Sequence, residues 1–131
     1  MKIFCVIPTF NEEKNISAII NQARSLVDAL VIVDDGSTDK TADFARAAEV
    51  VLLKHIVNRG QGAALRTGTA YSLNNGADII IHFDGDGQFL SRDIERIAAP
   101  IKAGVAQVVF GSRFLNSQDS SAMPIFKKYF I

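Results

Sequence analysis

The sequence predicts an α/β fold in which a mostly parallel β-sheet is covered by helices on both faces. Short apolar runs alternate along the chain with segments whose apolar residues recur at helical spacing. The short runs are continuously apolar, which is typical of parallel strands buried on both sides. No internal repeat or linker interrupts the alternation, so residues 1–131 are expected to form a single domain.

The alternation predicts five strands and four helices. The first helix is expected to begin at Asn11 as its N-cap, with Glu12 and Glu13 in the first turn, and to continue to Val27. The other helices are placed around residues 42–48, 63–74 and 94–101. The strands are placed at residues 3–7, 29–33, 50–53, 79–81 and 107–110.

The charge balance argues against binding to large polyanions. Fourteen basic residues and fourteen acidic residues cancel, so the formal net charge is zero. A neutral chain has no overall field that would attract nucleic acid or an anionic membrane. Nucleic acid is therefore not expected as a partner, and any anion must be bound by a local cluster.

Cysteine usage and hydropathy indicate a cytoplasmic location. Cys5 is the single cysteine and lies in an apolar run, which predicts a buried, inert thiol and a reducing compartment. The first apolar run stops at Pro8, unlike a signal peptide. No apolar stretch approaches the ~18 residues that a membrane span requires. We expect a soluble domain, at most peripheral to the cytoplasmic face of a membrane.

Polar clusters follow each predicted strand at its carboxyl end. In open parallel sheets, ligands bind beyond this edge. Clusters scattered by chance would lie at both ends of the strands, so their placement predicts a binding site. They are Pro8-Thr9, Asp34-Asp35, Gly60-Gln61-Gly62, Asp84-Gly85-Asp86 and Ser112-Arg113.

The most informative cluster follows the apolar run Ile79–Ile81. Asp84 and Asp86 are separated by one glycine, and Gln88 offers a further oxygen two residues on. Hard oxygen ligands on a rigid sheet edge suit Mg²⁺ or Mn²⁺, which in turn binds phosphate groups. For an isolated Asp-x-Asp a solvated turn is the plainer interpretation. The other clusters favour the metal site.

The cluster after the second strand has two interpretations. Asp35 can accept hydrogen bonds from a base or a ribose, as acidic residues after a strand do in dinucleotide-binding folds. Alternatively, Asp34-Asp35-Gly36-Ser37 forms only a turn and a helix cap. The binding interpretation is favoured for Asp35, whereas for Asp34 neither interpretation is favoured.

The remaining candidates carry weaker signals. Gly60-Gln61-Gly62 precedes a helix and offers backbone N–H groups to an anion, but Leu65 replaces the third glycine of a dinucleotide fingerprint. Arg113 either neutralises a phosphate or is an ordinary surface arginine. His55 and His82 lack the spacing of metal ligands and are interpreted as structural.

Four motifs in order resemble those of the family 2 glycosyltransferases. The resemblance implies a Rossmann-like GT-A fold that binds a nucleotide-diphospho-sugar, and it is closest to polyprenyl-phosphate (dolichyl-phosphate-type) mannosyl- or glucosyltransferases. Each motif alone is weak, but the ordered set covers nearly the whole chain. The motifs are Val6–Glu12, Val33–Asp39, Asn58–Ala64, and Asp84–Phe89 with Gly111-Ser112-Arg113 behind it.

The resemblance also implies roles at the matching positions. Glu12 would lie near the ribose or base, and Asp35 would contact the base. Asp84, Asp86 and Gln88 would hold the Mg²⁺ or Mn²⁺ ion, while Asp86 and Arg113 would have catalytic roles. The full implied set of substrate-binding residues is Pro8, Phe10, Glu12, Asp35, Asp84, Asp86, Gln88 and Arg113.

The implied reaction is metal-dependent transfer of a sugar from a UDP- or GDP-sugar with inversion. The expected acceptor is a polyprenyl phosphate, in cell-envelope or glycan biosynthesis; a sugar hydroxyl would require a general base that is not evident. The alternatives are a nucleotide-sugar-binding module without turnover and a haloacid-dehalogenase-like phosphotransferase. The latter would have Thr or Val where Gln88 stands.

Members of the resembled family continue well beyond the Gly-Ser-Arg motif. Residues 1–131 are therefore expected to be a donor-binding part without its acceptor-side region. The tail, Met123–Ile131, is apolar and basic, which indicates either a helix that packs on further protein or peripheral membrane contact. Incomplete cover of the sheet would favour self-association into a homo-oligomer.

Overall fold

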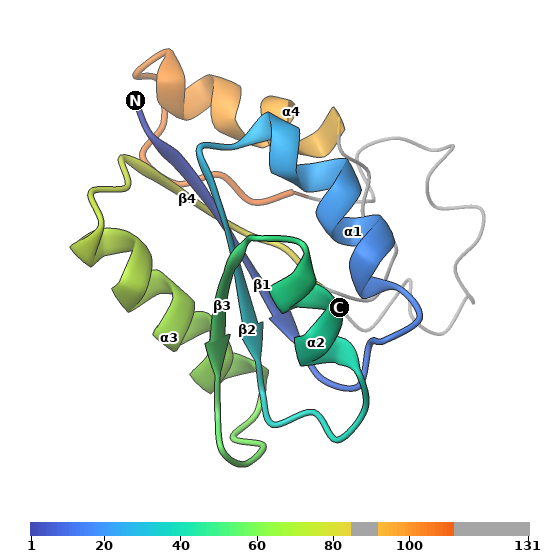
Figure 1. The fold of residues 1–131 in the computed structure, drawn as a ribbon. Helices are drawn as coiled ribbons and strands as arrows, with labels where there is room; N and C mark the ends of the chain where they lie inside the picture. Colours follow the sequence, from blue (N-terminus) through green and yellow to red (C-terminus); the bar gives the residue numbers. More distant parts are fainter. Residues whose placement is uncertain (85–91, 112–131) are drawn as a thin grey trace, which may run out of the picture.

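The computed structural model describes residues 1–84 and 92–111 (Figure 1). Strands and helices alternate as the sequence predicts, and a short 3₁₀ helix, η1 (Arg24–Leu26), follows the first α-helix. The elements are β1 (Ile3–Thr9), α1 (Ile16–Ala23), β2 (Ala29–Asp34), α2 (Thr41–Ala47), β3 (Val51–Lys54), α3 (Gln61–Asn74), β4 (Ile79–His82) and α4 (Arg92–Lys102).

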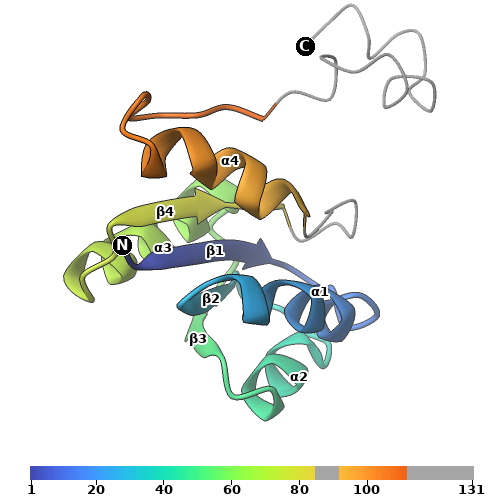
Figure 2. The same cartoon turned by 90° about the horizontal axis from the view of Figure 1, so that it is seen from above.

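The four described strands form one parallel sheet in the order β3-β2-β1-β4. Figure 2 shows this row from above, with α4 beside β4 at one end and α2 near β3 at the other. The chain leaves β1 toward one side of the sheet and later crosses back to the other. Strand order therefore reverses around β1, and a ligand site is expected at its carboxyl end.

Alternate residues of the central strand enter two separate cores. Ile3, Cys5 and Ile7 of β1 pack in the core beneath α1, α2 and α4, whereas Phe4 and Val6 pack beneath α3. The predicted arrangement, a parallel sheet with helices on both faces, is confirmed. Burial raises the pKa of the Cys5 thiol to about 12, so the thiol stays protonated and inert, as expected.

Helix α3 approaches the sheet closely at Gly68. A β-carbon at this position would lie 2.3 Å from Val6 Cγ1 and 3.0 Å from Val33 Cγ2. The backbone of Gly68 is helical and carries no positive φ. Glycine is therefore required by the close packing and not by the backbone conformation. The close approach fixes the amino end of α3 near the carboxyl ends of β1 and β2.

The predicted start of the first helix is wrong. Helix α1 begins at Ile16 with Asn15 as its N-cap, and Asn11 instead adopts a positive φ of 54°. The reason is a long-range contact: the backbone N–H groups of residues 11–13 bond to side chains of the loop at residues 37–41. These bonds hold Glu12 and Glu13 outside the helix.

The two loops, residues 11–13 and 37–41, are bonded in both directions. Asn11 N donates to Ser37 Oγ at 2.9 Å, and Glu12 N donates to Thr41 Oγ1 at 2.8 Å. In the opposite direction, Thr38 N donates to Asn11 Oδ1 at 3.0 Å. The backbone at the carboxyl end of β1 is thus positioned by the loop that follows β2. We call this pair of loops the loop clasp.

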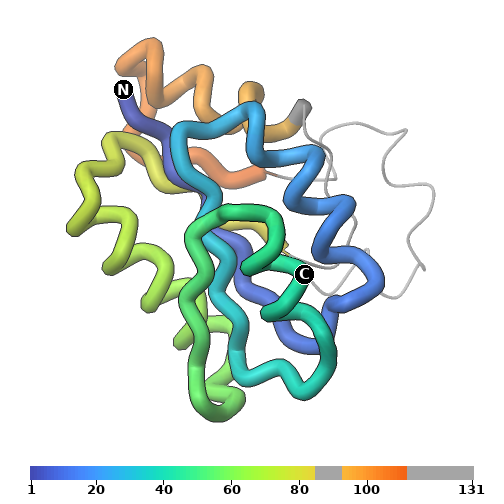
Figure 3. Tube along the Cα trace, in the orientation of Figure 1, coloured from blue at the N-terminus to red at the C-terminus, as the bar shows by residue number. Residues whose placement is uncertain are grey.

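The predicted fifth strand, residues 107–110, is also wrong. These residues belong to no strand of the described sheet, and Val108 and Phe110 are 67% and 89% exposed. An apolar run forms a strand only where a neighbour accepts its hydrogen bonds. Figure 3 traces this segment (red-orange) as it leaves α4. Among the described helices none combines the length and hydropathy needed to cross a bilayer.

Candidate functional site

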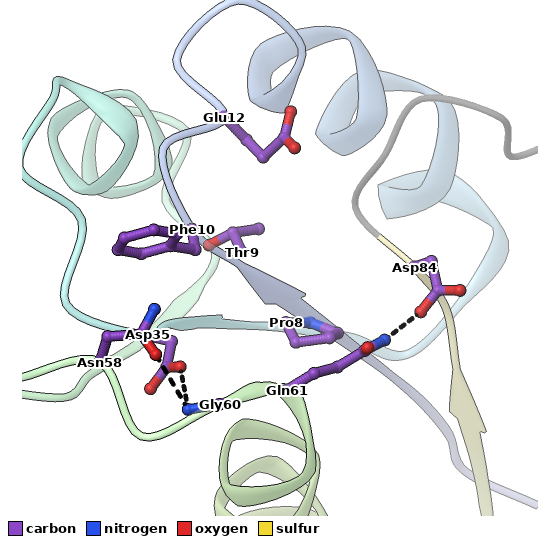
Figure 4. Close-up of a pocket in the computed structure, with 9 residues that line it drawn as sticks. All are labelled: Pro8, Thr9, Phe10, Glu12, Asp35, Asn58, Gly60, Gln61 and Asp84. Carbon is purple, nitrogen blue, oxygen red and sulfur yellow. Dashed lines mark hydrogen bonds between the residues drawn. The ribbon is translucent and has the colours of Figure 1, made fainter.

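A pocket of about 410 Å³ lies at the carboxyl edge of the sheet (Figure 4). Its lining comes from the segments after β1, β2, β3 and β4, so these strands meet at one site as predicted. The lining residues are Pro8, Thr9, Phe10, Glu12, Asp35, Asn58, Gly60, Gln61 and Asp84.

Five of the eight residues predicted to bind substrate line this pocket: Pro8, Phe10, Glu12, Asp35 and Asp84. The other three, Asp86, Gln88 and Arg113, lie outside the described residues. Four lining residues were not among the predicted site residues: Thr9, Asn58, Gly60 and Gln61. Their signal was nevertheless present, since all four belong to the polar clusters or motifs that follow strands.

Asp35 forms the buried end of the pocket. Its side chain is 4% exposed and accepts three hydrogen bonds. Oδ1 accepts from His55 Nδ1 at 2.6 Å and from Arg59 N at 2.9 Å, and Oδ2 accepts from Gly60 N at 2.7 Å. Burial alone would raise the pKa of this carboxyl, but the bonds from Arg59, His55 and Gly60 outweigh it and lower the pKa. The carboxylate is therefore ionised at neutral pH.

His55 supports the site from behind Asp35, although it does not itself line the pocket. Asp34 and Lys54 are paired in the β2–β3 register, so Asp35 and His55 are the next pair and leave the sheet side by side. Behind the ring, Nε2 lies 2.9 Å from Thr67 Oγ1 on α3. Spacing along the sequence gave no signal for this contact, whereas the strand register would have revealed it.

Asp34 is structural. It is fully buried, its Oδ1 accepts from Ser37 N at 3.1 Å, and its Oδ2 lies 3.7 Å from Lys54 Nζ. It does not line the pocket, so the turn interpretation holds for Asp34. The sequence had suggested that the Gly60 N–H would be free to bind an anion. Instead, it donates to Asp35 Oδ2 and Asn58 Oδ1.

Asp84 forms the other, exposed end of the pocket. Its Oδ1 accepts a hydrogen bond from Gln61 Nε2, which links β4 to the amino end of α3 (Figure 4). Exposed carboxylate oxygens suit Mg²⁺ or Mn²⁺, so the chemistry of Asp84 fits the predicted ion. Within residues 1–84 and 92–111, no three His, Cys, Asp or Glu side chains gather as a metal centre. The described chain thus supplies one of the three predicted ligands.

The wall between the two ends comes from β1 and the segment after it. Pro8 and Gln61 lie between Asp35 and Asp84, and the Phe10 ring lies near Asp35 (Figure 4). Phe10 is 46% exposed, so part of its ring is accessible at the pocket. The pocket therefore joins an aromatic face, a buried hydrogen-bond acceptor and an exposed carboxylate.

The parallel sheet with a pocket at its switch point is of the GT-A glycosyltransferase type, as comparison with solved structures and with the family shows. The same fold occurs in glucosyl-3-phosphoglycerate synthase from Mycobacterium tuberculosis, solved in complex with Mn²⁺, UDP-glucose and phosphoglyceric acid. The TM-score is 0.68 at 28% sequence identity, and the match covers 79% of this chain and 40% of that chain.

The chain belongs to glycosyl transferase family 2, whose pattern matches residues 4–129. It is 35% identical to the UDP-N-acetylglucosamine–dolichyl-phosphate N-acetylglucosaminyltransferase of Methanococcus voltae, over 96% of this chain and 57% of that protein. It is 32% identical to an undecaprenyl-phosphate mannosyltransferase of Micrococcus luteus, over 86% and 49% respectively. The chain thus spans about half the length of the curated relatives it matches.

Proposed function

We propose that residues 1–131 are the donor-binding domain of an inverting glycosyltransferase. The enzyme would move a sugar from a UDP- or GDP-sugar to a polyprenyl phosphate, in cell-envelope or glycan synthesis. The observation that carries the proposal is the pocket itself, with a buried acceptor at Asp35 and an exposed carboxylate at Asp84. Family membership argues against the haloacid-dehalogenase-like alternative.

In this proposal the nucleoside lies at the Asp35 end. The Phe10 ring offers an apolar face on which a base stacks, an interaction worth roughly 1–3 kcal/mol. Asp35 accepts a hydrogen bond from the base, and Glu12, on the opposite wall, faces the ribose or base. The loop clasp holds Glu12 in place through its backbone N–H.

The diphosphate lies toward Asp84. Asp84, with Asp86 and Gln88 from the sequence prediction, would hold Mg²⁺ or Mn²⁺, which supplies positive charge to the departing nucleoside diphosphate. The M. tuberculosis structure with Mn²⁺ and UDP-glucose supports this assignment by similarity. Arg113, also a sequence prediction, would neutralise phosphate. A lipid phosphate is already anionic, so it attacks the sugar carbon without a general base.

The acceptor implies a location at the cytoplasmic face of a membrane. Two relatives carry polyprenyl-phosphate acceptors in their names, which supports a lipid acceptor here. Membrane contact through Met123–Ile131 and self-association remain proposals from the sequence, because those residues lie outside the described part of the chain.

The test has two stages. Calorimetry on this chain measures binding of UDP and GDP with Mn²⁺ and with chelator, and the expected result is metal-dependent binding of at least one. The full-length protein is then assayed for transfer from UDP- and GDP-sugars to polyprenyl phosphate. Binding without any transfer by the full-length protein would instead identify a nucleotide-sugar-binding module.

A further inference from the structure

The Asp35 carboxylate has one acceptor position left. Its two oxygens offer about four lone-pair positions. Protein donors occupy three of these: His55 Nδ1 and Arg59 N at Oδ1, and Gly60 N at Oδ2. Oδ1 is therefore saturated, and Oδ2 retains one position. Because the side chain is 4% exposed, water does not compete freely for it.

A neighbouring donor accompanies this acceptor. Asn58 lines the pocket, and its Oδ1 accepts from Gly60 N at 3.1 Å, which leaves the two amide hydrogens of Nδ2 for a ligand. Asp35, Asn58 and Gly60 lie together at one end of the pocket (Figure 4). This end therefore presents the free position of Asp35 Oδ2 beside the amide hydrogens of Asn58 Nδ2.

We propose that this arrangement selects uridine over guanosine diphosphate donors, with His55 and Thr67 as the positioning residues. The inference rests on the proposed function, in which Asp35 meets the base. Uracil presents a single N–H donor, N3–H, flanked by two carbonyl acceptors, which matches one free position on Asp35 and an amide donor on Asn58. Guanine presents two adjacent donors, N1–H and the 2-amino group, which need both carboxylate oxygens.

His55 keeps one lone-pair position of Asp35 Oδ1 occupied, because its other ring nitrogen is held by Thr67. An ionised carboxylate only accepts, so His55 Nδ1 carries the proton that faces Asp35. In the neutral ring Nε2 then accepts from the Thr67 hydroxyl at 2.9 Å. The chain from Thr67 through His55 to Asp35 keeps Oδ1 occupied, so Asp35 offers no partner to guanine's second donor.

The first measurement is the affinity of the wild-type full chain for UDP and GDP in the presence of Mn²⁺, by calorimetry. UDP is expected to bind about tenfold more tightly or better, the scale of one buried unpaired donor. Manganese pyrophosphate is the probe without a base, and it reports pocket integrity independently of Asp35.

Variants test whether His55 and Thr67 position the Asp35 carboxylate or only support the fold. His55→Phe removes the donor and should narrow the UDP-to-GDP ratio to within about threefold, while His55→Asn keeps a donor near the Nδ1 position and should restore the preference. Thr67→Val should shift the ratio in the same direction as His55→Phe. Thr69→Val is the matched control, since Thr69 is equally half-buried on α3 and bonds His82 Nε2 at 2.8 Å outside the pocket. Pyrophosphate affinity should stay constant throughout.

The outcomes distinguish the two proposals. If neither UDP nor GDP binds with Mn²⁺, the proposed function fails. If both bind and GDP equals or exceeds UDP, the function stands and the uridine inference is overturned. If His55→Phe does not fold, the Thr67→Val and Thr69→Val pair decides, and equal UDP-to-GDP ratios in that pair would overturn the positioning role.

Discussion

The two ends of the pocket differ in how completely the chain arranges them before a ligand arrives. At one end Asp35 is buried and accepts three hydrogen bonds, from His55, Arg59 and Gly60. At the other end Asp84 is exposed, and within the described part of the chain it accepts one hydrogen bond, from Gln61. The buried end is fixed by the sheet register, whereas the exposed end is held, among the described residues, by one side-chain bond.

This difference suggests a division of work. A preorganised carboxylate discriminates between ligands, because a wrong partner leaves buried groups unsatisfied. An exposed carboxylate contributes affinity only when it gains a charged partner, such as a divalent ion. The identity of the nucleotide should therefore be recognised at Asp35, and metal-dependent affinity should come from Asp84. The predictions below test this contrast.

The largest effect is expected at the exposed end. Asp84→Asn should lower affinity for UDP with Mn²⁺ on the order of 10²-fold, the upper range for altered metal sites, and leave stability nearly unchanged. Asp86→Asn should lower turnover of the full-length enzyme by a similar factor. Asp43→Asn is the control, an exposed α2 carboxylate that pairs, within the described residues, with Arg46. Equal affinity with Mn²⁺ and with chelator in the wild type would contradict the metal role.

The second prediction concerns the buried end. Asp35→Ala should lower the free energy of unfolding by roughly 1–3 kcal/mol, because it leaves buried donors without an acceptor. It should also weaken nucleotide binding while manganese pyrophosphate binds as before. Urea denaturation and calorimetry measure the two effects. An equal loss of pyrophosphate affinity would place Asp35 at the metal site and remove the contrast.

The third prediction follows from the pKa of Asp35. Its pKa is lowered in the folded chain, so ionisation of Asp35 stabilises the fold above the unfolded pKa of about 3.9. This contribution is lost as the pH falls below about 4, through the folded pKa. Urea midpoints at pH 7, 5, 4 and 3 should therefore decline less for Asp35→Asn than for wild type. Parallel declines would show that Asp35 is not the titrating group.

The smallest effect is expected for Gln61→Ala. This change removes the bond that exposed Asp84 accepts from a described residue, so the free energy of unfolding should change by less than about 0.5 kcal/mol. Thermal unfolding in chelator provides the measurement. A loss above about 1 kcal/mol would mean that the exposed end is as firmly held as the buried one.

The sequence was sufficient to place Asp35 and Asp84 in one pocket. Both follow buried runs, and the carboxyl ends of parallel strands share an edge. The bond from His55 to Asp35 was not predicted, because it depends on the β2–β3 register, which spacing along the chain does not reveal. Local patterns also failed where distant partners decide. Asn11 was predicted to cap the first helix, but it bonds to Thr38 in the loop clasp instead. Residues 107–110 pair with no strand of the described sheet.

The loop clasp has an evolutionary consequence. Each loop supplies both backbone donors and side-chain acceptors to the other, as in the bonds of Glu13 N to Asp39 and of Lys40 N to Glu13. Each segment is held by bonds to its counterpart, although the bonded residues are separated by 26 to 29 positions. Natural selection therefore acts on residues 11–13 and 37–41 as one inherited unit. We expect substitutions in them to covary among relatives, and chimaeras that exchange only one segment to lose the geometry of the pocket rim.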